Sequence, residues 1–197
     1  MDIFLYNFDF IWFNSFLALI SVLLGWLMHK TSSKYLRVFY IFSWLIFLPN
    51  TLYILTDITH LFEVWAKLES LFKLLLIIQY ALFSILGILT FIYSIYLFQE
   101  LLEGKSRSKK KKRKITTFIR ILIVNFMVGF AMMLGGIQRT NSWDVVTNPG
   151  KVINDVFIVL SSREMMILSL GFGIIANIIY FYFEKPVVKW GNKYLKR

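Results

Sequence analysis

Five long apolar runs constrain this chain more than any other feature of its sequence. A hydrocarbon core of about 30 Å is crossed by about 20 helical residues, because each residue adds about 1.5 Å. With 58% hydrophobic residues, a soluble fold would leave large apolar patches in water. Since lipid offers no partner to open backbone groups, the runs must be helical. We expect an all-α polytopic membrane bundle, one integral membrane domain over residues 1–197, with spans at roughly 10–28, 38–56, 74–98, 115–137 and 165–183.

The basic residues gather at alternate ends of these runs. If the amino terminus lies outside and the helices alternate, the inner segments hold most of the 22 Lys and Arg residues. Cytoplasmic loops carry such an excess, so we expect the amino terminus outside and the carboxyl terminus inside. The first run lacks the basic start and the small-residue cleavage site of a secretory signal, so we expect it to be retained.

Two shorter segments outside the spans have helical patterns. In Asp57–Lys73, apolar residues recur at helical spacing and Glu63 with Lys67 forms an i,i+4 pair, which favours a short helix in the membrane interface. The turn signal Asn148-Pro149-Gly150 precedes an amphipathic stretch at 152–160 that is too short to span.

The spacing of small residues predicts a contact between two of the spans. Ser169, Gly173 and Asn177 repeat every four positions in the fifth run, and Asn125 and Gly129 do so in the fourth. Because small side chains let membrane helices approach closely, we expect the fourth and fifth spans to pack together.

A polar stretch ends the second span. If that helix continues to His60, the side chains of Asn50, Tyr53, Asp57 and His60 share one face. Pro49 removes a backbone hydrogen bond and favours a kink just before that face. An unpaired amide below the membrane surface is costly, so Asn50 is expected to face protein or a wet cavity.

A second polar cluster follows the fourth span. Arg139 offers a donor fork for a carboxylate or phosphate, and Asp144 offers an acceptor. Asn141 and Ser142 offer neutral hydrogen bonds, and Trp143 offers an interface anchor or a stacking surface. Both clusters lie at outer helix ends in the predicted topology. We therefore predict one outer-face ligand site made of Asn50, Tyr53, Asp57, His60, Arg139, Asn141, Trp143 and Asp144.

These two clusters are similar to the signature of a known family. They read Pro49-Asn50-x-x-Tyr53-x-x-Thr56-Asp57-x-x-His60 and Arg139-x-Asn141-Ser142-Trp143-Asp144. The family that they resemble is domain of unknown function 1361, an uncharacterised family of small bacterial integral membrane proteins. The resemblance covers most of the chain and implies a multi-pass protein of the bacterial plasma membrane. It implies no activity.

Two functional interpretations compete with binding or translocation of a small polar or anionic ligand. Asp57 and His60 at i,i+3, with Asp144 as a third ligand, suit zinc or manganese. A membrane-embedded hydrolase or transferase acting on a cell-envelope or lipid substrate would use His60 as base, Asp57 or Asp144 to orient it, and Arg139 as anion clamp. Ser142 or Thr56 could serve as its nucleophile, although neither lies in a nucleophile motif.

A non-catalytic membrane subunit or scaffold is the remaining interpretation. An Asp57–Arg139 pair at the lipid–water boundary would fix how two helices dock without performing chemistry. Five helices make a small transporter, so translocation would call for a homo-oligomer or a membrane partner.

The remaining composition limits cofactors and partners. The absence of cysteine excludes disulfides and thiolate metal sites, and no P-loop or dinucleotide motif identifies a cofactor. The net charge of +11 is explained by the basic residues on the predicted inner side of the membrane. Among these, the Lys105–Lys114 connector is expected to anchor the inner face. Anionic lipid head groups are its expected partner, at about 1 kcal/mol per basic residue. Nucleic acid is not expected, because aromatic residues are absent from that connector.

Overall fold

The computed structural model describes residues 2–56, 65, 70–104 and 110–195, and the side chains of residues 11–56, 65, 70–104 and 114–189. In this part of the chain every regular element is an α-helix and none is a strand. The helices are α1 (Asp2–Lys30), α2 (Lys34–Phe47), α3 (Pro49–Thr56), α5 (Ser70–Glu103), α6 (Lys110–Gly136), α7 (Asp144–Thr147), α8 (Pro149–Ser161) and α9 (Arg163–Leu195).

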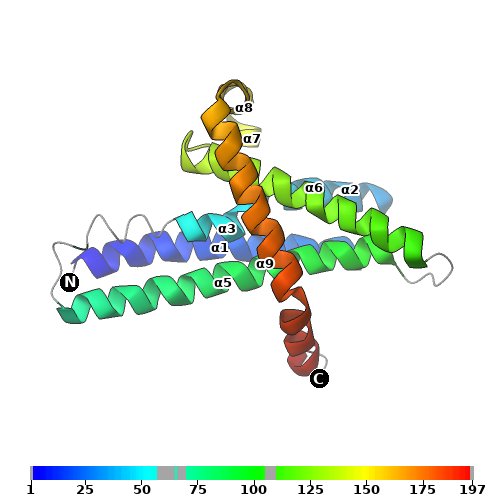
Figure 1. Ribbon diagram of the computed structural model, residues 1–197, viewed down its shortest axis with the longest axis horizontal. Helices are drawn as coiled ribbons and strands as arrows, with labels where there is room; N and C mark the ends of the chain where they lie inside the picture. Colours follow the sequence, from blue (N-terminus) through cyan, green and yellow to red (C-terminus); the bar gives the residue numbers. More distant parts are fainter. Residues whose placement is uncertain (1, 57–64, 66–69, 105–109, 196–197) are drawn as a thin grey trace.

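Five stretches of helix are long and apolar enough to cross a membrane. They cover Ile11–Lys30, Lys34–Thr56, Ser70–Glu103, Lys114–Gly136 and Arg163–Lys189. Each overlaps one predicted span, so the five-helix interpretation is confirmed and the protein is a multi-pass membrane protein. In Figure 1, α1 and α5 run side by side, while α9 crosses them on its way from α8 to the carboxyl terminus.

The second span is two helices rather than one. Proline has no backbone N–H, so the helical ladder is interrupted at Leu48, between α2 and α3. The N–H of Thr51 donates to the carbonyl oxygen of Leu48 at 3.1 Å, and the Thr51 hydroxyl donates to the same oxygen at 2.7 Å. The helix is therefore interrupted where the kink was predicted, just before Asn50, and Leu48 itself keeps helical φ and ψ of −55° and −41°. The kink stays a prediction.

The fourth and fifth spans pack closely, as their small residues predict. A Cβ atom added at Gly129 would lie 2.3 Å from the backbone nitrogen of Gly173, so the helices α6 and α9 touch through their backbones. Beside this contact, Asn125 Nδ2 donates to Asn177 Oδ1 at 3.0 Å. Asn177 Nδ2 in turn donates to the carbonyl oxygen of Gly173 at 2.8 Å.

The main core lies where α2, α5, α6 and α9 meet. Trp44 of α2 is fully buried there, and its ring stacks on that of Phe98 at a centroid distance of 4.8 Å. Its Nε1 donates to Ser94 Oγ at 2.6 Å, and Ser94 Oγ also shares a hydrogen bond of 2.7 Å with Ser21 Oγ of α1. The contacts of Trp44 and Ser94 therefore join α1, α2 and α5.

Two short helices connect α6 to α9. The predicted amphipathic stretch at 152–160 is confirmed as part of α8, which begins at Pro149 after the cap residue Asn148. The Asn148 side chain accepts a hydrogen bond from the N–H of Lys151 at 3.2 Å. Most of the predicted interfacial helix at Asp57–Lys73 lies outside the described residues, and its last four residues belong to α5.

Candidate functional site

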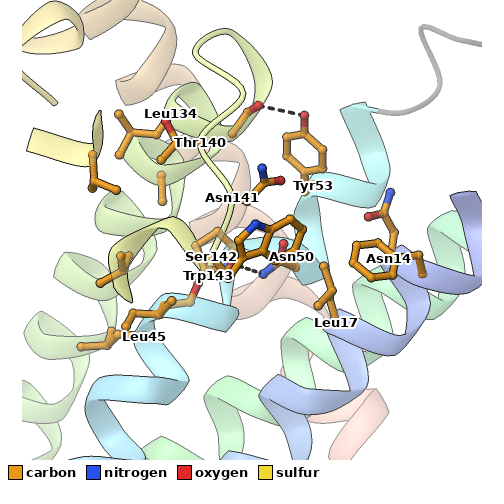
Figure 2. A pocket seen from close by; sticks show the side chains of 17 residues that line it. Asn14, Leu17, Leu45, Asn50, Tyr53, Leu134, Thr140, Asn141, Ser142 and Trp143 are labelled. Atoms are coloured by element: carbon orange, nitrogen blue, oxygen red, sulfur yellow. Dashed lines mark hydrogen bonds between the residues drawn. The ribbon is translucent and has the colours of Figure 1, made fainter. Parts of the chain in front are cut away.

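A cavity of about 180 Å³ lies between α1, the α2–α3 junction and the connection from α6 to α7. Figure 2 shows that its polar side chains come from three segments far apart in the sequence. They are Asn14 of α1, Asn50 and Tyr53 of α3, and Thr140, Asn141, Ser142 and Trp143 of the α6–α7 connection. Four of the eight predicted site residues line this cavity, namely Asn50, Tyr53, Asn141 and Trp143.

The two sequence motifs meet directly at the α2–α3 break. Asn50 Nδ2 donates to Ser142 Oγ at 2.8 Å, drawn as a dashed line in Figure 2. The same amide donates to the carbonyl oxygen of Phe47 at 3.0 Å, and Ser142 Oγ donates to that of Ile46 at 3.1 Å. Because Pro49 interrupts the ladder just after these carbonyls, the motifs supply hydrogen bonds at the break.

Tyr53 makes the second link between the two walls. Its hydroxyl donates to the carbonyl oxygen of Gly135 at 3.0 Å. A Cβ atom at Gly135 would lie 3.0 Å from the Tyr53 ring, so α6 and α3 approach closely here. On the far side of the connection, Thr140 Oγ1 donates to Asp155 Oδ2 of α8 at 2.7 Å. The loop is thus tied to α3 on one side and to α8 on the other.

Asp144 is held by its own turn. Its Oδ2 accepts hydrogen bonds from the N–H of Asn141 at 2.7 Å and from Lys151 Nζ at 3.2 Å. The Asn141 hydrogen bond is the main cause that lowers the pKa of the Asp144 carboxyl, and Lys151 lowers it further. Asp144 therefore stays ionised and paired, and it does not line the cavity.

Arg139 stands apart from the cavity as well. Its backbone has φ 53°, a left-handed conformation that reverses the chain after α6. The side chain is exposed and is not among the residues that line the cavity. The carbonyl oxygen of Arg139 accepts a hydrogen bond from Lys151 Nζ at 2.9 Å. Lys151 thus fastens the turn at two points, a role that the sequence pattern did not reveal.

Asp57 and His60, which were predicted to complete the site, lie outside the described residues. In the ranges that the structure does describe, no three His, Cys, Asp or Glu side chains are grouped to hold a metal ion. The zinc or manganese site of Asp57, His60 and Asp144 stays a prediction.

The wall formed by α1 was missed by sequence reasoning. Phe13 packs edge-on against Trp143 with ring centroids 5.7 Å apart, and Asn14 is buried beside it. One signal was available, because Asn14 is an amide inside the first apolar run, near the end of the bundle that holds Asn50. The cost of burying an unpaired amide argues that such a residue faces protein.

The comparisons with known proteins agree with the signature motifs. Neither a curated protein nor a solved structure matches the chain. The family described as protein of unknown function (DUF1361) matches residues 13–179, a stretch that contains both motifs and all five spans in whole or in part. The chain belongs to this family.

Proposed function

We propose that this membrane protein binds a small polar ligand in the cavity between α1, α3 and the α6–α7 connection. The observation that carries the proposal is the convergence of amides and hydroxyls from three segments on one cavity of about 180 Å³. An engineered apolar cavity of about 150 Å³ in another protein accommodates benzene, so this one suits a group of about six non-hydrogen atoms. A pocket with a few convergent polar groups is typical of ligand sites.

A non-catalytic membrane subunit is the second candidate. It is favoured by the hydrogen bonds that Asn50 and Ser142 already make with each other and with the carbonyls of Ile46 and Phe47. Groups satisfied in this way stabilise an interrupted helix without any ligand. Hydrolase or transferase chemistry would depend on Asp57 and His60, and no described contact favours it.

The orientation is also part of the proposal. The amino terminus lies outside and the carboxyl terminus inside the plasma membrane of a bacterium, so the cavity opens at the outer face. The charge asymmetry of the sequence supports this, because the Lys105–Lys114 connector and the basic tail then lie inside. Anionic lipid head groups are the proposed partner of that connector.

Cysteine labelling tests the orientation, since the chain has no cysteine of its own. Val146 of α7 and Ser32 of the α1–α2 turn are both exposed and lie at opposite ends of the spans. A membrane-impermeant maleimide added to intact cells is expected to label Val146→Cys and to label Ser32→Cys only after permeabilisation. The reverse pattern would contradict the orientation.

Mass spectrometry of molecules released from the purified protein tests ligand binding. We expect the wild type to carry a bound polar small molecule or lipid, and Asn50→Leu to retain about tenfold less of it. Leaving a polar partner unpaired costs about 1–3 kcal/mol, and about 1.4 kcal/mol is a factor of ten. Ser142→Ala provides a second, smaller change at the same wall.

Asn154→Leu is the matched control, because Asn154 is exposed on α8 and lies outside the cavity. It is expected to retain the wild-type amount of the bound molecule. Equal amounts in Asn50→Leu, Ser142→Ala and wild type, all monodisperse, would favour the non-catalytic subunit instead.

A further inference from the structure

We propose that the ligand is the uncharged, hydroxyl- or amide-bearing head group of an amphiphile, which reaches the cavity from the bilayer between α1 and Trp143. This inference rests on the proposed function and names the chemical class of its ligand. It departs from the anion that Arg139 suggested in the sequence.

The lining of the cavity is neutral. Among the described residues, none of the side chains that line it is charged. The nearby Lys151 ammonium is paired with Asp144 at 3.2 Å, and the carboxylate of Asp155 accepts from Thr140. An anion buried without a cation loses its hydration and gains no ion pair in return. Amides and hydroxyls instead match a head group that both donates and accepts hydrogen bonds.

Apolar side chains line the cavity beside the polar ones. In Figure 2, Leu17 lies near Asn14, and Leu134 lies near Thr140. A uniformly polar solute would place polar groups against these leucines without hydrogen bonds. A molecule with both a polar head and apolar carbons matches a lining of this mixed kind.

The wall between the cavity and the lipid is a pair of aromatic rings. Phe13 and Trp143 line the cavity, yet they are 46% and 40% exposed. Phe13 belongs to the span Ile11–Lys30, where its neighbours Trp12 and Phe16 are also exposed on α1. The outer side of this ring pair therefore continues the lipid-facing surface of α1. The two rings meet edge-on at this point, with their centroids 5.7 Å apart.

The size of the cavity fits a head group rather than a whole lipid. A volume of about 180 Å³ holds about six non-hydrogen atoms, as in a glycerol unit. An acyl chain attached to such a unit would extend between Phe13 and Trp143 into the bilayer, where it loses no apolar burial.

Two probes with the same chain separate the head-group classes. Monoolein carries an uncharged glycerol ester, oleate carries a carboxylate, and free glycerol reports a head group without a chain. Saturable binding to the detergent-solubilised, full-length protein is measured by native mass spectrometry. We expect monoolein to bind at least tenfold more tightly than oleate or glycerol. Asn50→Leu and Ser142→Ala should weaken monoolein binding, by about tenfold for Asn50→Leu.

Two further variants locate the site. Asn154→Leu and Arg139→Gln are expected to bind monoolein as the wild type does, because neither side chain lines the cavity. A monoolein analogue with a diazirine in its acyl chain is expected to crosslink to peptides of α1 around Phe13.

Three results would overturn the inference while leaving ligand binding intact. In the first, oleate binds as tightly as monoolein and Arg139→Gln weakens its binding. In the second, glycerol binds as tightly as monoolein. In the third, the crosslinks are confined to α8. If none of the probes binds in an Asn50-dependent way and no molecule co-purifies with the wild type, the proposed function itself fails.

Discussion

Replacement of Gly129 by alanine is expected to destabilise the protein by about 3 kcal/mol, the upper end of the range for overpacked cores. The added Cβ would lie 2.3 Å from the nitrogen of Gly173 and 2.5 Å from the carbonyl oxygen of Ser169. Both are backbone atoms, so no side chain can rotate away and α6 must separate from α9. Separation also weakens the hydrogen bond from Asn125 to Asn177. Denaturant-induced unfolding in detergent micelles measures the loss.

Gly171→Ala is the matched control for Gly129→Ala. Gly171 lies on α9 near the same contact, but a Cβ atom there meets nothing within 4 Å. Alanine is preferred over glycine in a helix by about 0.5–1 kcal/mol, so this variant is expected to be as stable as the wild type or slightly more so. If both variants unfold alike, the backbones of α6 and α9 do not touch at Gly129.

The α6–α9 contact could be predicted because its cause is local in the sequence. Two membrane helices touch through their backbones only where the side chains are small on both helices. Gly129, Ser169 and Gly173 meet this requirement, and their small side chains can be read directly from the sequence. The five spans follow from length and apolarity for the same reason. The α2–α3 break lies at Pro49, as the missing N–H predicts, although Pro186 lies inside α9 without ending that helix.

The candidate site could be predicted only in part. Topology brings the ends of the second and fourth spans to one side of the membrane, and Asn50 does meet Ser142 there. The contribution of Phe13 depends on how α1 is rotated about its axis, which its apolar sequence leaves open. Asp144 pairs with Lys151 because the left-handed turn at Arg139 and the cap at Asn148 fold the connection back on itself. The Asp144–Lys151 pair depends on this loop conformation, and no periodic pattern in the sequence predicts it.

Replacement of Trp44 by alanine is expected to destabilise the protein by about 3–5 kcal/mol, the usual cost of removing a large aromatic side chain from a core. Trp44 is 0% exposed, stacks on Phe98 and donates to Ser94. Trp12→Ala is the control, since Trp12 is 69% exposed on the lipid-facing side of α1 and its loss leaves no internal cavity. Unfolding of the two variants is compared in the same detergent.

Trp44→Phe separates packing from hydrogen bonding at this position. Ser94 Oγ keeps its hydrogen bond to Ser21 Oγ when the indole N–H is removed, so no buried group loses its last partner. The expected cost in stability is about 1 kcal/mol for the lost hydrogen bond. The smaller ring of phenylalanine adds a packing cost to this. A loss in Trp44→Phe as large as that in Trp44→Ala would mean that the Trp44–Ser94–Ser21 network, rather than apolar contact, joins α1, α2 and α5.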